Sequence, residues 1–377
     1  MPQAAYIHVP FCAHRCGYCN FAVVAGRGEL VPAYLDAIDR ELASLVDEPQ
    51  PVITLYFGGG TPTQLGCEGL ERLGEIVLAH HPLLQSDTRG YEWTIEANPA
   101  DMSTDMARTI ANSGANRLSL GGQSFRPEKL KLLERDHTAS DIIRSMQLAH
   151  EHKLAVSLDL IFATPDETLD QWHRDLQQAI DLQPEHISVY GLTFEKGTTY
   201  WGRLLRGELV ESEDELQRDM YLSTIERLNQ AGYEHYEVSN FARPGHRSRH
   251  NETYWRGDEY FAAGPGAARY VAGVRETNHR STTTYLRRVQ AGESPVAERE
   301  QLDHEARARE RLVFGLRRLE GVDRQEFQAA TGYAVEQLAA EAIDKFVDIG
   351  LLQVDDHRVK LTREGLLVSD AMWPEML

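Results

Sequence analysis

Cysteine is scarce in this sequence, and long apolar runs are absent. Four cysteines occur in 377 residues, which is too few for a fold that depends on disulfides. Cys67 stands apart from the other three, and we interpret it as a small hydrophobe. No apolar run approaches the roughly 18 residues that cross a bilayer, and the opening MPQAAYIHVP lacks the basic start of a signal peptide. We therefore expect a cytoplasmic protein with no integral membrane segment.

Basic residues are in deficit. Lys and Arg number 39 against 58 Asp and Glu, which gives a net charge of −19 at pH 7. A surface of that sign repels phosphate backbones and anionic lipids, so we expect no nucleic-acid partner. A hydrophobic content of 42% with 26% charged residues is typical of a globular protein. At about 100–200 residues per domain, the length allows two or three domains.

Short apolar runs alternate with helical patterns through the first 230 residues. Runs typical of strands are 5–9, 52–57, 93–97, 117–120, 154–162 and 186–190, and helical spacing is found at 31–47, 102–113, 140–152 and 167–182. Six strand-then-helix units favour a parallel α/β architecture. Because a complete eight-unit barrel takes about 250 residues, we predict an α/β fold with a partial (β/α)6 barrel over residues 1–235.

The alternation stops after this region. Residues 236–300 are rich in Gly, Arg, His and aromatics and predict a loop-rich segment. Residues 301–377 predict a winged-helix-like α+β module, with helices at 307–319, 323–331 and 335–350 and a β-hairpin of 351–354 and 358–362. From residue 306 onward this part has 10 Lys and Arg against 13 Asp and Glu. A DNA-binding wing is normally basic, so we expect the module to pack on the barrel or on a partner.

Three cysteines follow the first predicted strand within eight residues: Cys12, Cys16 and Cys19. Their thiolates would be soft ligands, suited to zinc or to an iron–sulfur cluster. A structural zinc site needs four ligands, and the fourth would have to be His8 or His14, both at awkward spacing. Three cysteines with an open fourth position favour a 4Fe-4S cluster with one iron free. Zinc and unrelated buried cysteines remain the alternatives.

The spacing Cys-x-x-x-Cys-x-x-Cys, with Tyr18 before the last cysteine, resembles the cluster motif of the radical S-adenosylmethionine (radical SAM) enzymes. In that superfamily SAM ligates the free iron, and an electron from the reduced cluster cleaves it to a 5′-deoxyadenosyl radical. The longer string from Tyr6 to Cys12 (YIHVPFC) resembles the coproporphyrinogen III oxidase-like family, which contains oxygen-independent oxidases and heme chaperones. This resemblance covers nearly the whole chain and implies SAM and a 4Fe-4S cluster bound by the three cysteines.

A glycine-rich segment, Phe57–Thr63 (FGGGTPT), follows the second strand. Glycine allows close backbone approach to a ligand, and exposed N–H groups can bind a carboxylate; a tight β-to-α turn is the alternative. From the residues alone, Glu96 could equally be a solvated strand end, Arg135 a surface arginine and Asp159 a structural carboxylate. The family resemblance implies that SAM is bound by Tyr6, Tyr18, Gly59, Gly60, Thr61, Glu96, Gln123, Arg135 and Asp159.

The segment His250–Trp255 (HNETYW) carries an imidazole and two large aromatics. Imidazole is a good axial ligand for heme iron, and flat rings can stack on a porphyrin. The alternative is a structural loop whose His and Asn form hydrogen bonds. His-Asn-x-x-Tyr-Trp resembles the signature of the heme-chaperone (HemW) group of the family, which implies that His250 binds heme. The oxidases usually carry a further cysteine where this chain has Phe21.

Three functions follow from these patterns. The first is heme binding and transfer to an unidentified acceptor protein on a radical SAM scaffold. The second is SAM-dependent oxidative decarboxylation of coproporphyrinogen III, which needs cations for the substrate's carboxylates; Arg135, Arg247 and Arg249 are candidates. The third is another radical SAM reaction.

Overall fold

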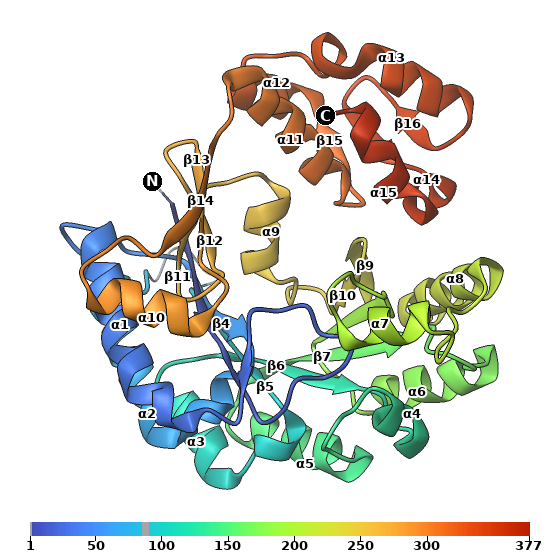
Figure 1. Ribbon diagram of the computed structural model, residues 1–377. Coiled ribbons are helices and arrows are strands. Elements are labelled where there is room, and N and C mark those ends of the chain that lie inside the picture. The colour runs from blue at the N-terminus through green and yellow to red at the C-terminus, as the bar shows by residue number, and fades with distance from the viewer. Residues whose placement is uncertain (1, 85–89) are drawn as a thin grey trace.

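A computed structural model describes residues 2–84 and 90–377 of the chain. Figure 1 shows a curved sheet with helices along its outer side and a separate helical module that ends at the C-terminus. Among the described residues, no helix combines the length and the apolar character that a bilayer crossing requires.

The central sheet has nine strands, and its two end strands do not pair with each other, so the barrel is open. In spatial order they are β11 (Phe261–Ala263), β1 (Ala4–Val9), β4 (Thr54–Gly59), β5 (Glu92–Ala97), β6 (Arg117–Gln123), β7 (Ala155–Phe162), β8 (His186–Gly191), β10 (Asn240–Ala242) and β9 (Glu234–Glu237). Strands β11 to β8 run parallel, while β10 is antiparallel to both neighbours. The predicted partial barrel of six strand–helix units is confirmed.

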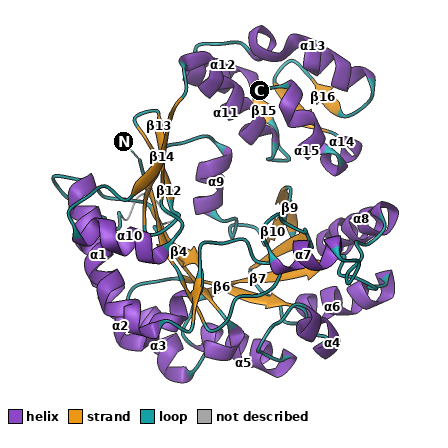
Figure 2. Cartoon of the chain, in the orientation of Figure 1, coloured by secondary structure: helices purple, strands orange, loops and turns teal. Residues whose placement is uncertain are grey.

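Helices cover the outer face of this sheet (Figure 2). They are α1 (Val31–Leu45), α2 (Gly66–His80), α3 (Thr104–Asn112), α4 (Pro127–Leu132), α5 (Ala139–Glu151), α6 (Leu169–Asp181) and α8 (Asp214–Gln230), with 3-10 turns at Gly28–Leu30, Pro62–Leu65 and Pro99–Asp101. Helix α7 (Thr199–Leu205) lies at the carboxyl end of the strands, where the Tyr200 N–H donates to the Gly17 carbonyl at 2.9 Å. Helices α5 and α6 begin with capping boxes at Thr138 and Thr168, which satisfy the first N–H groups of each helix. The apolar faces of sheet and helices form one continuous core.

Regular structure occupies more of residues 236–300 than the sequence predicts. Beyond β9, β10 and β11, the segment contains α9 (Arg249–Trp255), β12 (Ala268–Val271), β13 (Val274–Asn278), α10 (Thr282–Gln290) and β14 (Val296–Gln301). Strands β12, β13 and β14 form a small antiparallel sheet with six charged residues among its fifteen, and Arg275 of β13 is bonded to Glu300 of β14. Charged pairs of this kind replace the apolar alternation that a sequence reading looks for.

A buried carboxylate attaches this segment to the barrel. Glu41 of α1 accepts hydrogen bonds from the Gly264 N–H at 2.9 Å, from Asn278 at 2.6 Å and from the Tyr285 hydroxyl at 2.6 Å. Burial raises the pKa of Glu41, while these donors and Arg269 act in the opposite direction. A buried polar group that is satisfied from three separate elements fixes their relative positions.

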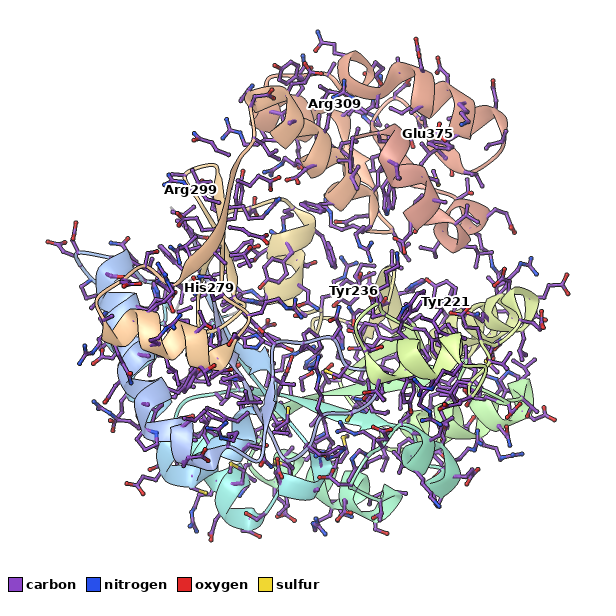
Figure 3. The ribbon with its side chains drawn as sticks, viewed as in Figure 1. Tyr221, Tyr236, His279, Arg299, Arg309 and Glu375 are labelled. Carbon is purple, nitrogen blue, oxygen red and sulfur yellow. The ribbon has the colours of Figure 1, made fainter. Side chains whose placement is uncertain are left out.

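The last 74 residues form a module with its own core. Its elements are α11 (His304–Leu316), β15 (Val322–Asp323), α12 (Arg324–Thr331), α13 (Val335–Asp348), β16 (Leu352–Val354), β17 (Arg358–Leu361), α14 (Arg363–Leu367), α15 (Ser369–Met372) and a 3-10 turn at Trp373–Glu375. The three predicted helices and the hairpin are confirmed. The module packs on the barrel beside Tyr221 and Tyr236, both labelled in Figure 3, and the Leu319 N–H donates to the Tyr236 carbonyl at 3.1 Å.

A buried ionic network supports the turn after β6. Lys129 Nζ lies 2.5 Å from Glu167 and 3.2 Å from Asp175, and all three side chains are fully buried. Asp175 also accepts the Ser124 hydroxyl at 2.6 Å and the Phe125 N–H at 2.9 Å. Removal of one member of such a network leaves an unpaired buried charge. The network therefore stabilises the turn that follows the carboxyl end of β6.

We expect Asp175→Ala to lower the free energy of unfolding by about 3–5 kcal/mol, because Lys129 then loses a buried counter-charge. Urea unfolding followed by tryptophan fluorescence measures the change. The matched control is Asp181→Ala, which removes an exposed carboxylate from the same helix and should shift stability by no more than about 0.5 kcal/mol. Equal losses in the two variants would contradict this role of the network.

Candidate radical SAM site

A cavity of about 400 Å³ lies at the carboxyl end of the parallel strands. Its walls come from the loops after β1, β4, β5, β6, β7 and β8, together with the start of α9. Loops at this end of a parallel barrel converge on one point, because every strand ends there in the same direction. Residues far apart in the sequence therefore meet in one site.

All three clustered cysteines line this cavity. Cys12 belongs to β2 (Phe11–Cys12), which pairs with β3 (Val24–Ala25). Cys16 is buried, and its carbonyl accepts the Cys19 N–H at 3.1 Å. The far end of the loop is held by His8, whose Nε2 lies 2.9 Å from the Ala22 carbonyl oxygen. The loop is thus tied to the sheet at both ends.

The thiols are chemically suited to a cluster. Burial raises the pKa of Cys12 to about 11, the neighbouring thiols add to this rise, and burial also raises the pKa of Cys19. Three thiolates can therefore share the cavity only beside a strong positive charge, which bound metal supplies. A 4Fe-4S cluster places each of three thiolates on a different iron.

The hydrogen bonds of the glycine-rich turn after β4 differ from those predicted from the sequence. The N–H groups that were expected to bind a carboxylate are already occupied. Gly59 donates to Glu96 Oε2 at 3.0 Å, Gly60 to the Val9 carbonyl at the end of β1 at 2.8 Å, and Thr61 to the Phe11 carbonyl of β2 at 2.7 Å. Gly59 has a φ of +101°, which glycine adopts without strain. The segment therefore forms the tight turn of the alternative reading, and it also lines the cavity.

Two carboxylates face the cavity, Glu96 from β5 and Asp159 from β7. Glu96 Oε1 accepts the Tyr56 hydroxyl at 2.8 Å, and Asp159 Oδ2 accepts the Ser119 hydroxyl at 3.4 Å. Burial raises the pKa of Glu96 to about 7 and that of Asp159 to about 6. Glu96 is therefore not the solvated strand end that the residues alone allowed. Carboxylates held in this way favour a ligand that brings hydrogen-bond donors or positive charge.

A guanidinium also lines the cavity, next to the cysteine loop. Arg135 Nη1 lies 3.6 Å from Cys16 Sγ, and Nη2 donates to Asn98 Oδ1 at 3.2 Å and to the Gly121 carbonyl at 3.1 Å. Its Nε is buried and has no hydrogen-bond partner in the described structure. A buried donor without an acceptor leaves room for an anionic ligand group. Arg135 is not a surface arginine, and Asn98, which positions it, was missed by the sequence analysis.

Eight of the nine residues predicted to bind SAM line the cavity: Tyr18, Gly59, Gly60, Thr61, Glu96, Gln123, Arg135 and Asp159. Gln123 adopts a left-handed φ of +63° at the end of β6. Tyr6 is not among the lining residues; its hydroxyl lies 3.1 Å from His8 Nδ1. Arg247 and Arg249 also lie outside it, where Arg247 pairs with Glu234. These two arginines therefore supply no cationic pocket for the carboxylates of a decarboxylase substrate.

The cavity also has a polar floor, which was not predicted from the sequence. It consists of Thr94, Arg117, Ser119, Ser157, His186 and Ser188, which point inward from β5 to β8. Ser119 is in register with Ser157 on the neighbouring strand. The signal was present, because single small polar residues interrupt otherwise apolar strands, which is uncommon in parallel sheets.

His250 does not line the cavity but is buried beside it at the start of α9. Its Nδ1 lies 3.0 Å from Thr54 Oγ1, its Nε2 lies 2.8 Å from the Tyr254 hydroxyl, and its ring stacks on Tyr56. Burial lowers the pKa of His250 to about 3. The hydrogen-bonded arrangement of the alternative reading is therefore present, and an iron bond would require one ring nitrogen to leave its partner.

Two sequence-family models match the chain. One is described as "Radical SAM superfamily" and matches residues 6–179, and the other is described as "HemN C-terminal domain" and matches residues 302–368. A protein of Lactococcus lactis named heme chaperone HemW is 34% identical over all of this chain and 97% of its own length. One of the same name from Escherichia coli is 32% identical over 98% and 97%. The coproporphyrinogen III oxidase HemN of Escherichia coli superposes with a TM-score of 0.86 over 100% of this chain and 90% of its own. At 21% identity, that likeness concerns the fold alone.

The open barrel and the cysteine loop define a radical SAM protein. Within that superfamily, the chain belongs to the HemW family, as its full-length relatives show. Membership in the radical SAM superfamily implies a 4Fe-4S cluster and SAM as cofactors.

Cys16→Ala should abolish cluster assembly, because the buried central thiol of the loop is lost. We expect anaerobically reconstituted variant protein to lack bound iron and the broad absorption near ~400 nm that iron–sulfur proteins show. Cys67→Ala is the control: Cys67 lies in α2 against the core, away from the cavity. Iron content near that of the wild-type protein in Cys16→Ala would exclude this thiol as a cluster ligand.

Proposed function

We propose that the protein is a heme chaperone: it binds heme and passes it to an acceptor protein, on a radical SAM scaffold. The observation that carries this proposal is similarity along the entire chain to proteins named heme chaperone HemW, at 34% identity in Lactococcus lactis, 32% in Bacillus subtilis and 36% in Mycobacterium tuberculosis. The His-Asn-x-x-Tyr-Trp segment at 250–255 and the absence of a cysteine at Phe21 support it.

We assign the cluster to Cys12, Cys16 and Cys19 and the SAM site to the eight lining residues named above. When bound, the reduced cluster supplies an electron that can cleave SAM. The chain's own residues orient the ligand: Glu96 offers a carboxylate to an amino group, and Arg135 offers its unpartnered Nε to a carboxylate beside Cys16. The narrow turn at Gly59 holds the Glu96 carboxylate in place.

SAM binding should depend on the ionisation of Glu96. With a pKa of about 7, its ionised fraction falls as the pH drops from about 8 to about 6, and only the ionised form attracts an amino group as a full anion. Tyr56 and Asp159 face it. We expect the SAM affinity of the cluster-loaded protein to fall roughly tenfold over this range.

Glu96→Gln keeps the hydrogen-bonding shape but removes the titration, so its SAM affinity should be lower at pH 8 and should change less with pH. Equilibrium dialysis of anaerobic, reconstituted proteins measures both profiles. Parallel pH profiles for wild type and variant would show that a group other than Glu96 controls binding.

Heme handling is tested by hemin titration of wild type and His250→Ala, followed by absorbance. We expect one hemin per chain in the wild type, and an affinity about tenfold lower, or an altered spectrum, in the variant. His279→Ala is the matched control, because His279 follows β13 away from α9 (Figure 3).

A wild-type protein that binds no hemin would overturn the proposal. Anaerobic decarboxylation of coproporphyrinogen III in the presence of SAM would then assign the oxidase function that the resemblance also allowed. Heme binding together with the absence of that decarboxylation fits a chaperone.

A further inference from the structure

A second cavity, of about 320 Å³, lies where α9 meets helix α11 and the small antiparallel sheet. It is partly open to solvent and is separate from the cysteine-lined cavity, with which it shares no lining residue. In Figure 1, α9 lies between the barrel and the C-terminal module, with β12–β14 at its side. None of the residues assigned above to SAM or the cluster borders this second cavity.

Aromatic side chains form its walls. Tyr254 and Trp255 come from α9, Tyr260 and Tyr270 from the sheet region, and Phe314 from α11. The rings of Tyr254 and Tyr260 lie edge to face with centroids 4.7 Å apart, and the backbones of Tyr260 and Tyr270 bond to each other at 2.8 and 3.0 Å. The indole N–H of Trp255 is buried and has no acceptor in the described structure. Such walls suit a flat aromatic ligand that also carries hydrogen-bond acceptors.

Three arginines border the same cavity. Arg275 is engaged with Glu310 and Glu300 at 2.7 Å each, and Arg311 lies 3.3 Å from Asp258. Within residues 2–84 and 90–377 no carboxylate lies within 4.0 Å of the Arg307 guanidinium, whose Nε donates to the Asp303 backbone carbonyl at 3.4 Å. The lining has three arginines against two acids, Asp258 and Glu310. An arginine without a counter-charge is well suited to bind a carboxylate in a two-pronged contact.

Gly273 lies beside the Arg307 guanidinium. A Cβ atom on Gly273 would lie 2.3 Å from Arg307 Nη1, and Gly273 has a φ of +75°. This φ favours glycine, and the absence of a side chain at residue 273 leaves room for the Arg307 guanidinium beside the hairpin between β12 and β13.

We infer that this cavity is the binding site of the heme of the proposed function, on which the inference rests. The aromatic residues contact the macrocycle, and Arg307, with Arg311, binds its carboxylates. Helix α9 supplies Ser248 and Asn251 from its start to the SAM cavity, and Tyr254 and Trp255 from its end to the heme cavity. Because the cavity is partly open, an acceptor protein can reach its ligand.

A charge series at Arg307 tests the inference in the full-length, cluster-loaded protein. Hemin and iron-free protoporphyrin IX are titrated into wild type, Arg307→Lys, Arg307→Ala and Arg307→Glu. We expect both ligands to bind about tenfold more weakly to the Ala variant, more weakly still to the Glu variant, and at an intermediate level to the Lys variant. SAM affinity, which depends on the other cavity, should stay unchanged in all four and reports correct folding.

Arg309→Ala is the matched control. Arg309 lies two residues along α11, pairs with Glu305 at 2.8 Å and does not border the cavity (Figure 3). Tyr270→Leu, which removes an aromatic wall from a different element, should also weaken both ligands and guards against an Arg307 variant that fails to fold.

Unchanged affinity for both ligands across the Arg307 series and in Tyr270→Leu, with wild type still binding hemin, would overturn the cavity assignment while the proposed function stands. An absence of hemin binding by the wild type would overturn the proposed function and this inference together. A loss confined to hemin, with protoporphyrin IX unaffected, would overturn the assignment of Arg307 to the carboxylates.

Discussion

The geometry of the cysteine-lined cavity depends on how closely the chain packs around His8. A Cβ on Gly59 would lie 2.3 Å from the His8 ring, and one on Gly264 would lie 2.4 Å from its carbonyl oxygen. Burial lowers the pKa of His8 to about 4, so the ring is neutral. Because the Ala22 carbonyl can only accept, Nε2 carries the proton and Nδ1 accepts from the Tyr6 hydroxyl. With both nitrogens occupied, His8 cannot be the fourth zinc ligand considered from the sequence.

This arrangement explains why Tyr6 does not line the cavity although it belongs to the motif that precedes the cysteines. Its hydroxyl fixes the His8 tautomer, and that tautomer holds the end of the cysteine loop at Ala22. Tyr6 is therefore a positioning residue in this structure. A motif shows that a residue matters at a site, but only the packing shows whether the side chain contacts the ligand or supports a residue that does.

The strands and helices of the barrel could be predicted from the sequence because each unit is local and strongly apolar. Strand β11 could not, since it has three residues and pairs with β1 some 250 positions earlier. Cavity residues at strand ends could also be predicted, because the carboxyl ends of parallel strands converge on one site. The expectation of free N–H groups in the glycine-rich turn was wrong. The acceptors of these N–H groups lie on other strands, which sequence spacing does not reveal. Thr54, the partner of His250, was hidden for the same reason.

Helix α9 borders both cavities, so the loss of His250 can change heme binding without any bond between His250 and iron. The N–H of His250 donates to Glu92 on β5 at 3.0 Å, while its ring bonds Thr54 on β4 and Tyr254 in the last turn of the helix. Loss of the imidazole would free Thr54 and the Tyr254 hydroxyl, while the backbone N–H groups of residues 249 and 250 would still hold the start of the helix on Glu92. Weaker heme binding without His250 would follow from a displaced aromatic wall as readily as from a lost iron ligand. Only a change in the iron's ligand-field spectrum, which iron-free porphyrin cannot give, separates ligation from support.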